Sequence, residues 1–347
     1  MVHTMHEAML YTTLDDHKVG CHLCGRRCQI PDGKLGYCQV RKNEKGTLYS
    51  LVYGKACSAN PDPIEKKPLW HFHPGSLVMS VATVGCNFRC YFCQNFQISH
   101  ERDIVGRSLS PQNIVDMALQ TGCTGVSYTY TEPTIFFEYA YDTAKIAQEH
   151  GLFNTFVTNG YMTPEAVETI APYLDAATVD FKGNANPGFY KQFCNVPSVD
   201  PIFDSLKAMK TAGIHIEITN LLVTEVGDDL QDAESLALWI VKELGADTPL
   251  HLLRFYPHHK MSNLPPTPVK TLEAAAEASL RAGLKYVYLG NVPGHQGANT
   301  VCSNCGALII ERLGIQTTSV RLTRQGRCPS CNLPIPIILP EDSSKVR

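Results

Sequence analysis

Short apolar runs alternate with amphipathic stretches between residues 61 and 293. Each apolar run has the length of a buried strand, and each amphipathic stretch has the period of a helix. We expect strands at residues 77–84, 125–130, 153–158, 176–181, 214–223, 250–255 and 286–289, and helices at residues 111–120, 134–150, 163–174, 200–212, 229–244 and 271–282. Strand–helix repetition gives parallel strands joined by right-handed crossovers. The pattern therefore predicts an α/β protein, either a barrel or partial barrel or an open doubly wound sheet.

Composition narrows the class of protein. The chain has 347 residues, of which 44% are hydrophobic and 18% are charged, as in an ordinary globular protein. Its formal net charge of −3 supplies no global basic field for nucleic-acid binding. No apolar run is long enough to cross a bilayer, and the first residues lack a signal-peptide pattern. We expect a cytoplasmic protein without a membrane partner.

The fourteen cysteines point to metal binding. In a small secreted chain they would suggest disulfides, but this chain is large and carries no export signal. Eleven of them fall into three groups with short internal spacings, and the other three, Cys57, Cys123 and Cys194, are expected to be buried thiols.

The central group is a C-x3-C-x2-C motif formed by Cys86, Cys90 and Cys93. Three thiolates leave one iron of a four-iron, four-sulfide cube open, and an open iron can bind a small molecule and pass it an electron. Tyr91 and Phe92 supply apolar shielding within the motif. The alternatives are a zinc site lacking one ligand, or cysteines grouped by chance.

The N-terminal stretch, residues 1–60, is expected to be a loop-rich module held by metal. Its candidate ligands are Cys21, Cys24, Cys28 and Cys38. Four thiolates complete either a tetrahedral zinc site or a fully ligated iron–sulfur cluster, and Cys57 could replace one of them. Four protein ligands leave no open position, so a structural or electron-transfer role is expected.

The C-terminal stretch, residues 296–347, holds two C-x2-C pairs separated by 22 residues. The cysteines are Cys302, Cys305, Cys328 and Cys331. This spacing is typical of a zinc ribbon, with rubredoxin-like iron as the second possibility.

The cysteine motif resembles that of the radical S-adenosylmethionine (SAM) superfamily. Over nearly the full chain, the sequence resembles the AmmeMemoRadiSam-system radical SAM enzymes, which are relatives of pyruvate formate-lyase activating enzyme. The resemblance rests on the cysteine-rich start, the cysteine motif, the terminal ribbon and the runs Asp-Pro-Ile-Glu-Lys-Lys-Pro-Leu, Tyr-Thr-Glu-Pro-Thr, Arg-Phe-Tyr-Pro and Gly-Asn-Val-Pro-Gly.

The resemblance implies a partial (β/α)6 barrel, residues 61–295, with a [4Fe–4S] cluster whose open iron binds SAM. It implies reductive cleavage of SAM to a 5′-deoxyadenosyl radical, which abstracts a hydrogen atom. An electron donor such as flavodoxin or ferredoxin is implied, and the substrate could be a glycine of a partner protein, as for the activating enzymes. The rival function is a zinc- or iron-binding scaffold, or an RNA-binding protein that uses the arginines near the ribbon.

Candidate SAM-binding residues follow the strands. Thr131 and Glu132 take the place of the Gly-Gly-Glu-Pro stretch of the activating enzymes, whose paired glycines are here Tyr130 and Thr131. Glu132 would face the ammonium of SAM, or else cap the helix that follows. The remaining candidates are Asn159, Asp180, Lys182, Arg254 and Asn291.

Two of these candidates lie two residues apart on one strand, so Asp180 and Lys182 point the same way. The resemblance to the activating enzymes implies that both side chains line the SAM pocket. The alternative is a solvated ion pair at the end of the strand. Arg254 could pair with a carboxylate of SAM or of substrate, and Asn291 could bind adenine or close the barrel. The polar, proline-broken stretch at residues 62–75 is expected to be a structured linker, or a lid over the barrel mouth.

Overall fold

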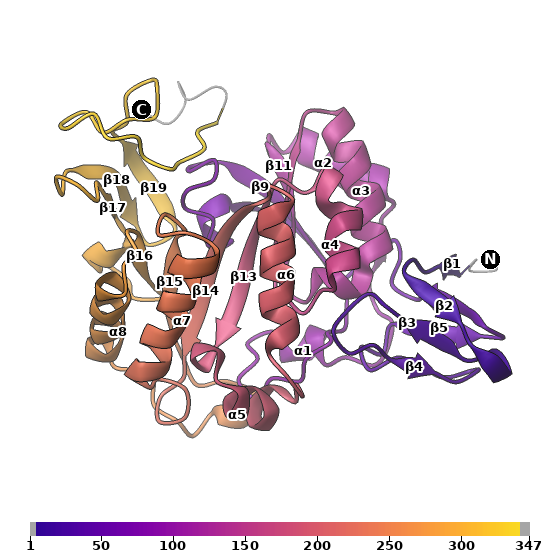
Figure 1. The fold of residues 1–347 in the computed structure, drawn as a ribbon. Coiled ribbons are helices and arrows are strands. Elements are labelled where there is room, and N and C mark those ends of the chain that lie inside the picture. Colours follow the sequence, from indigo (N-terminus) through magenta and orange to yellow (C-terminus); the bar gives the residue numbers. More distant parts are fainter. Residues whose placement is uncertain (1–4, 341–347) are drawn as a thin grey trace.

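The computed structural model describes residues 5–340 and is built around one eight-stranded sheet (Figure 1). Seven strands are parallel: β9 (Leu77–Ala82), β11 (Gly125–Tyr128), β12 (Phe153–Thr158), β13 (Ala176–Lys182), β14 (His215–Leu222), β15 (Leu250–Arg254) and β16 (Val287–Gly290). They lie side by side in chain order, and β8 (Ser58–Pro63) pairs antiparallel with β9 at one edge. The parallel α/β prediction is confirmed. Because the order never reverses, the doubly wound alternative is wrong, and the sheet is open between its edge strands β8 and β16.

A helix follows each parallel strand from β9 to β15. The helices are α2 (Pro111–Gln120), α3 (Phe137–Glu149), α4 (Pro164–Ile170), α6 (Asp200–Thr211), α7 (Leu230–Glu243) and α8 (Val269–Arg281). Figure 1 shows them in front of the sheet, as successive right-handed crossovers in one direction require. Ser110, Thr163 and Asp229 accept hydrogen bonds from the first turns of α2, α4 and α7. The sequence therefore sets where these helices begin.

Shorter helical elements lie in the connections. Two are α-helical, α1 (Phe96–Ser99) and α5 (Pro187–Phe189), and a π-helical turn, Tyr190–Cys194, follows α5. Turns of 3-10 helix lie at Asp15–His17, Ile64–Lys66, Pro133–Phe136, Ala171–Tyr173, Gly183–Ala185, His259–Met261 and Gln296–Ala298.

Residues 64–76 cover the face of the sheet opposite the helices. Thr178 on β13 donates a 2.5 Å hydrogen bond to the carbonyl of Lys67, and Glu217 on β14 accepts one of 2.7 Å from the backbone N–H of His71. Thr178 and Glu217 lie toward the amino ends of their strands. The stretch is therefore a linker packed under the sheet, and the lid alternative is wrong for most of its length.

The N-terminal module consists of short strands and turns. Its strands are β1 (His6–Glu7), β2 (Tyr11–Thr13), β3 (Val19–Cys21), β4 (Gln29–Ile30), β5 (Arg41–Glu44), β6 (Thr47–Ser50) and β7 (Lys55–Ala56), the last pairing with β10 (Arg107–Ser108). The loop between β3 and β4 docks on the loop after β12, where Gly25 donates from its N–H to the carbonyl of Tyr161 at 2.9 Å. The cysteine-rich loop thus reaches the carboxyl edge of the main sheet.

The C-terminal module is a three-stranded antiparallel sheet of β17 (Thr300–Val301), β18 (Leu308–Leu313) and β19 (Gln316–Val320). It is anchored to residues 64–76, because Ile338 donates from its N–H to the carbonyl of His71 at 2.7 Å. Trp70, Tyr288 and Ile309 belong to one buried cluster at this junction. Within residues 5–340, no helix combines the length and apolar composition needed to span a bilayer.

Candidate active site

The three cysteines of the central motif lie in one loop, between β9 and α1, at the carboxyl edge of the sheet. The N–H of Phe88 donates to the Cys86 sulfur at 3.3 Å, and the Cys93 sulfur lies 3.1 Å from Ser99 Oγ. Burial raises the pKa of Cys86 and of Cys93, and the neighbouring Cys90 raises both further. A bound metal would stabilise these thiols as thiolates, and three thiols in one largely buried loop fit an iron–sulfur cluster.

Two aromatic residues of the motif differ in position. Phe92 is buried and packs its ring against that of Phe189 at 5.6 Å, so it shields the loop. Tyr91 is 37% exposed, and the Lys260 ammonium lies 4.7 Å from its ring centroid. Phe92 is therefore the inner wall of the cysteine loop and Tyr91 is the outer one.

Glu132 is fully buried and holds the ends of two strands together. Its Oε1 accepts from the N–H and hydroxyl of Thr134 at 3.0 and 2.6 Å and from the Thr158 hydroxyl at 2.6 Å. Its Oε2 accepts from the backbone N–H of Asn159 at 2.8 Å. Burial raises the pKa of Glu132 despite these donors. Glu132 therefore caps the helical turn that follows, and its Oε2 retains a free lone pair.

Asn159 connects that strand end to the cysteine loop. Its side-chain amide donates to the side-chain oxygen of Asn87 at 2.7 Å and lies 3.9 Å from the Cys86 sulfur. The left-handed turn at Gly160 directs the chain away, and the Asn159 oxygen accepts from the N–H of Tyr161. Asn159 thus fixes the position of the first cysteine.

Asp180 and Lys182 lie on one face of β13, as their spacing predicts. The Lys182 ammonium is 3.1 Å from the Asp180 carboxylate, which also accepts a hydrogen bond from the Thr219 hydroxyl. Burial opposes the charge of Lys182, but Asp180 and the nearby Cys90 outweigh it and raise its pKa. This ion pair therefore borders the cysteine loop.

Three candidate SAM-binding residues already hydrogen-bond within the protein: Thr131, Arg254 and Asn291. Thr131 donates from its hydroxyl to the carbonyl of Thr83 at 2.8 Å. Arg254 donates from Nε to the carbonyl of Thr267 at 2.7 Å, and Asn291 donates to the carbonyl of Arg254 at 3.2 Å. The last two join β15 to β16, several strands away from the cysteine loop.

Sequence analysis did not predict the contacts of three residues beside the site, Asn87, Cys194 and Tyr130. Asn87 lies between Cys86 and Phe88, but nothing in the motif distinguishes it from a spacer. The Cys194 thiol hydrogen-bonds with that of Cys90, which raises the pKa of Cys90. These two cysteines are far apart in sequence, so no spacing signal could join them.

Tyr130 is the third, and its backbone is left-handed, with φ at +63°. A non-glycine residue in that region is strained, because its Cβ crowds the backbone. Its hydroxyl donates to Asp62, and the Lys67 ammonium lies 4.4 Å from its ring centroid. Tyr130 thereby links the strand end to the linker at residues 64–76.

The C-terminal cysteines form a compact metal-binding group. The sulfurs of Cys302, Cys305, Cys328 and Cys331 all lie within 4.8 Å of one another. The pairs Cys302–Cys331 and Cys305–Cys328 are each 3.6 Å apart, too long for a disulfide and close to the edge of a tetrahedron around one zinc ion. This set fits a single metal ion.

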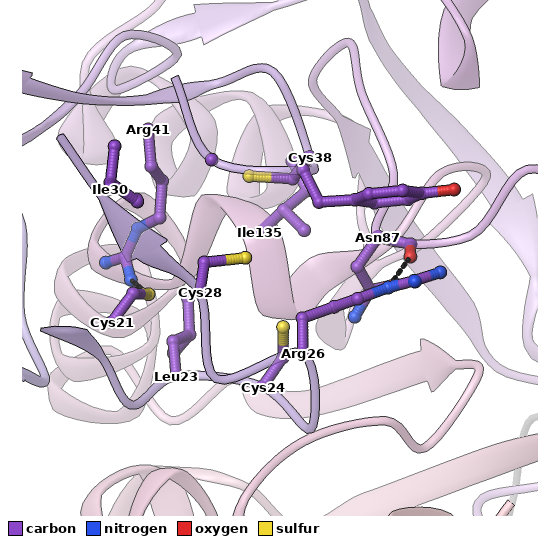
Figure 2. A pocket seen from close by; sticks show the side chains of 12 residues that line it. Cys21, Leu23, Cys24, Arg26, Cys28, Ile30, Cys38, Arg41, Asn87 and Ile135 are labelled. Carbon is purple, nitrogen blue, oxygen red and sulfur yellow. Dashed lines mark hydrogen bonds between the residues drawn. The ribbon is translucent and has the colours of Figure 1, made fainter. Parts of the chain in front are cut away.

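The N-terminal cysteines also converge. Cys21, Cys24, Cys28 and Cys38 line one pocket together with Arg26, Arg41 and Asn87 (Figure 2). Burial raises the pKa of Cys38 to about 11 and that of Cys24 still higher. Cys57 and Cys123 do not line this pocket, so the substitution of Cys57 for one of the four is wrong.

Comparisons with known proteins point to the radical SAM enzymes. The family model of the radical SAM superfamily matches residues 80–240, which include the three cysteines of the central motif. An uncharacterized protein of Methanocaldococcus jannaschii is 47% identical over 338 residues, covering 96% of this chain and 100% of that protein. The (2S)-3-sulfopropanediol dehydratase activating enzyme of Klebsiella oxytoca is 24% identical over 243 residues, covering 68% of this chain and 74% of that enzyme.

A solved structure shares the fold. The radical SAM methyltransferase from Sphaerobacter thermophilus superposes with a TM-score of 0.51 at 17% identity, over 68% of this chain and 71% of that one. Fold and cysteine loop together fit an α/β protein that holds an iron–sulfur cluster. The match assigns residues 80–240 to the radical SAM superfamily. This membership implies a [4Fe–4S] cluster and SAM.

Proposed function

We propose that the protein cleaves SAM reductively and abstracts a hydrogen atom from its substrate. The observation that carries this proposal is the meeting of Cys86, Cys90 and Cys93 with Asn159 and the Asp180–Lys182 pair at the carboxyl edge of a parallel sheet. Ligands bind at that edge in α/β folds. The three thiolates would hold three irons of the cluster, which when reduced supplies the electron that splits SAM into methionine and an adenosyl radical.

The side chains around the loop have complementary chemistry for SAM. The free lone pair of Glu132 Oε2 suits the ammonium, and Lys182 suits the carboxylate or a ribose oxygen. Asp180 can accept from a ribose hydroxyl. Thr131 supports the strand end beneath Glu132, with Tyr91 and Phe92 as walls.

Arg254 and Asn291 lie toward the far strands of the same edge. Arg254 is proposed to pair with a carboxylate of SAM or of substrate, and Asn291 to bind adenine or to brace the edge of the sheet. Both already hydrogen-bond to backbone groups, which fixes them in place.

The substrate is proposed to be a residue of a partner protein, as in an activating enzyme. The similarity to the K. oxytoca enzyme supports this class of reaction. Reduction would need a one-electron donor such as flavodoxin or ferredoxin. The C-terminal group is proposed to hold a structural zinc ion, with rubredoxin-like iron as the alternative, because its four sulfurs leave no open position.

The RNA-binding rival rests on four arginines near the ribbon, Arg312, Arg321, Arg324 and Arg327. It loses its main support, since three of them interact within the protein. Arg312 is 6% exposed and donates into the protein, Arg321 pairs with Glu311 at 3.1 Å, and Arg327 donates to the carbonyl of Asn332.

Release of 5′-deoxyadenosine tests the proposal. Protein reconstituted without oxygen and reduced with dithionite should release it from SAM. Cys90→Ala should abolish the release, whereas Cys123→Ala, a buried cysteine between α2 and β11, should leave it unchanged. Release that persists in Cys90→Ala, or is absent from the iron-loaded wild type, would contradict the proposal.

A further inference from the structure

We define the N-terminal cysteine site as Cys21, Cys24, Cys28 and Cys38. These four cysteines line one partly open pocket. Figure 2 shows the sulfurs of Cys24, Cys28 and Cys38 directed toward that space, with Cys21 beside Arg41. Three of the four thiols therefore converge on one pocket.

The C-terminal cysteines of the same chain show the sulfur spacing expected for a single metal ion. The four C-terminal sulfurs lie within 4.8 Å of one another, and no other group of three or more ligand-bearing side chains in residues 5–340 is as compact. The four N-terminal sulfurs are thus more widely spaced. A cluster spaces its thiolates widely because each one binds a different iron, whereas the ligands of one zinc ion share a single centre.

Hydrogen-bond donors surround the N-terminal cysteine site. Backbone N–H groups of Arg26, Tyr37 and Val40 donate to the sulfurs of Cys24, Cys28 and Cys38. The buried Arg41 guanidinium donates to the Cys21 sulfur at 3.3 Å and is paired with Glu138. Such donors stabilise the negative charge of a thiolate-ligated cluster.

Asn87 points to a ligand at the same place. It is 0% exposed, lines the pocket, and its side-chain NH2 has no hydrogen-bond partner among the described residues. An orphaned buried donor is costly unless a missing group accepts from it. A sulfide of a bound cluster is such an acceptor.

The N-terminal cysteine site also adjoins the central cysteine loop. Asn87 directly follows Cys86, and Arg26 donates from Nε to the Asn87 carbonyl at 3.0 Å. A Cβ on Gly85 would lie only 3.1 Å from the carbonyl oxygen of Cys38. Arg89 donates to the carbonyls of both Cys86 and Tyr37. Residues of the two sites are thus in direct contact.

We propose that Cys21, Cys24, Cys28 and Cys38 hold a second, fully ligated [4Fe–4S] cluster in contact with the loop of the first. Its four thiolates leave no open iron, so it does not bind SAM. Its coupling to the first cluster rests on the proposed function, but its own assembly does not.

Metal analysis and electron paramagnetic resonance (EPR) test this assignment in the full chain, reconstituted without oxygen. The wild type should bind about eight irons and eight sulfides, and two variants should each bind about four. One variant is Cys24→Ala with Cys28→Ala, and the other is Cys86→Ala with Cys90→Ala and Cys93→Ala. Cys57→Ala, which removes a thiol outside the pocket, should retain all eight.

The EPR spectra test the contact between the sites. Reduced with dithionite, the wild type should give a signal broadened by coupling between two paramagnets, and each variant a single unbroadened signal. SAM should perturb the signals of the wild type and of the Cys24/Cys28 variant, but not that of the triple variant.

The C-terminal group accounts for one zinc per chain. A second zinc and no iron in the triple variant overturn the assignment even if the double variant does not fold, and so does a wild type with about four irons. Iron in the triple variant, combined with no SAM effect in the double variant, would uphold the second cluster while refuting the proposed function.

Discussion

The side chain of Asn159 donates a 2.7 Å hydrogen bond to the side chain of Asn87, and so joins the end of β12 to the cysteine loop. Asn159 receives its own position from Glu132, which accepts from its backbone N–H. A chain of buried polar contacts therefore runs from a strand end to the first cysteine. Groups that orient metal ligands from behind set the affinity and reactivity of the site.

Asn159→Ala tests this contact. We expect the variant to bind its iron but to release 5′-deoxyadenosine about 10- to 100-fold more slowly, because Cys86 loses its support. The measurement is the initial rate of release per bound iron. Asn154→Ala is the matched control, since Asn154 is a buried asparagine at the other end of β12. Equal loss of rate in both variants would assign Asn159 a merely structural role.

Glu132→Gln separates the capping role of this residue from SAM binding. Gln would place an NH2 group against the N–H of Asn159 or the donors at Oε1, so we expect a loss of about 1–3 kcal/mol in stability. If Glu132 also binds the ammonium, the Kd for SAM should rise at least about tenfold. Thr134→Val removes the hydroxyl hydrogen bond to Oε1 but keeps the capping N–H and the carboxylate. SAM affinity is measured by calorimetry. If both variants lose SAM affinity in the same proportion to their loss of stability, the ammonium role is excluded.

Arg312→Lys tests the anchor of the C-terminal module. The guanidinium donates to the carbonyls of Ala298 and Trp70 and to the hydroxyl of Thr300, and one ammonium cannot reproduce this geometry. We expect a loss of about 2–3 kcal/mol in the free energy of unfolding by urea. Arg321→Lys, in an exposed pair, should change it by less than about 0.5 kcal/mol. Similar losses in both variants would contradict the anchoring role.

Cys305→Ser combined with Cys328→Ser tests the compact C-terminal group. We expect loss of about one zinc per chain with iron content unchanged, because among residues 5–340 only this set is spaced for a single ion. Without the metal, residues 300–335 should become sensitive to protease. Cys57→Ser is the control, and retained zinc in the double variant would refute the assignment.

His71 should make stability depend on pH. Burial lowers its pKa to about 4, against a partial rise from Glu217. Its Nδ1 lies 2.9 Å from the carbonyl of Pro336, so that nitrogen carries the proton and Nε2 accepts from Tyr288 at 2.6 Å. Between about pH 6.5 and pH 4 the unfolded chain binds more protons, so the unfolding free energy falls as the pH falls.

We expect His71 to lower the unfolding free energy at pH 5 by about 2 kcal/mol relative to pH 7.5. Urea unfolding at both values measures it, with His71→Gln as the comparison, because glutamine does not titrate. The variant should show a smaller pH-dependent loss by that amount. Equal losses in both proteins would mean that His71 is not held neutral in the fold.

The regular elements could be predicted because local patterns determine them. The strand at residues 153–158 was predicted at its observed bounds, since an apolar run there ends at an Asn-Gly turn. Strand β8 was missed because Pro61 and Pro63 lower its β propensity, and only its position at an edge tolerates them. Burial of the linker under the sheet was expected only in part, because it depends on partners such as Glu217 far along the chain.

The candidate site divides in the same way. The thiolate groups and the Asp180–Lys182 pair follow from short spacings, which a sequence displays directly. The contact of Cys194 with Cys90 and the bridge of Asn159 to Asn87 join distant segments, so only the folded chain reveals them. The SAM-binding residues stay predictions, since their hydrogen bonds within the protein do not identify a ligand.

Electron–nuclear double resonance on the reduced protein tests the central claim most directly. SAM labelled with ¹⁵N at its amino group and ¹⁷O at its carboxylate is added to dithionite-reduced, iron-loaded protein. If three cysteines leave one iron open, both labels should show hyperfine coupling to the cluster. A reduced cluster whose spectrum shows no coupling to either label would contradict the account.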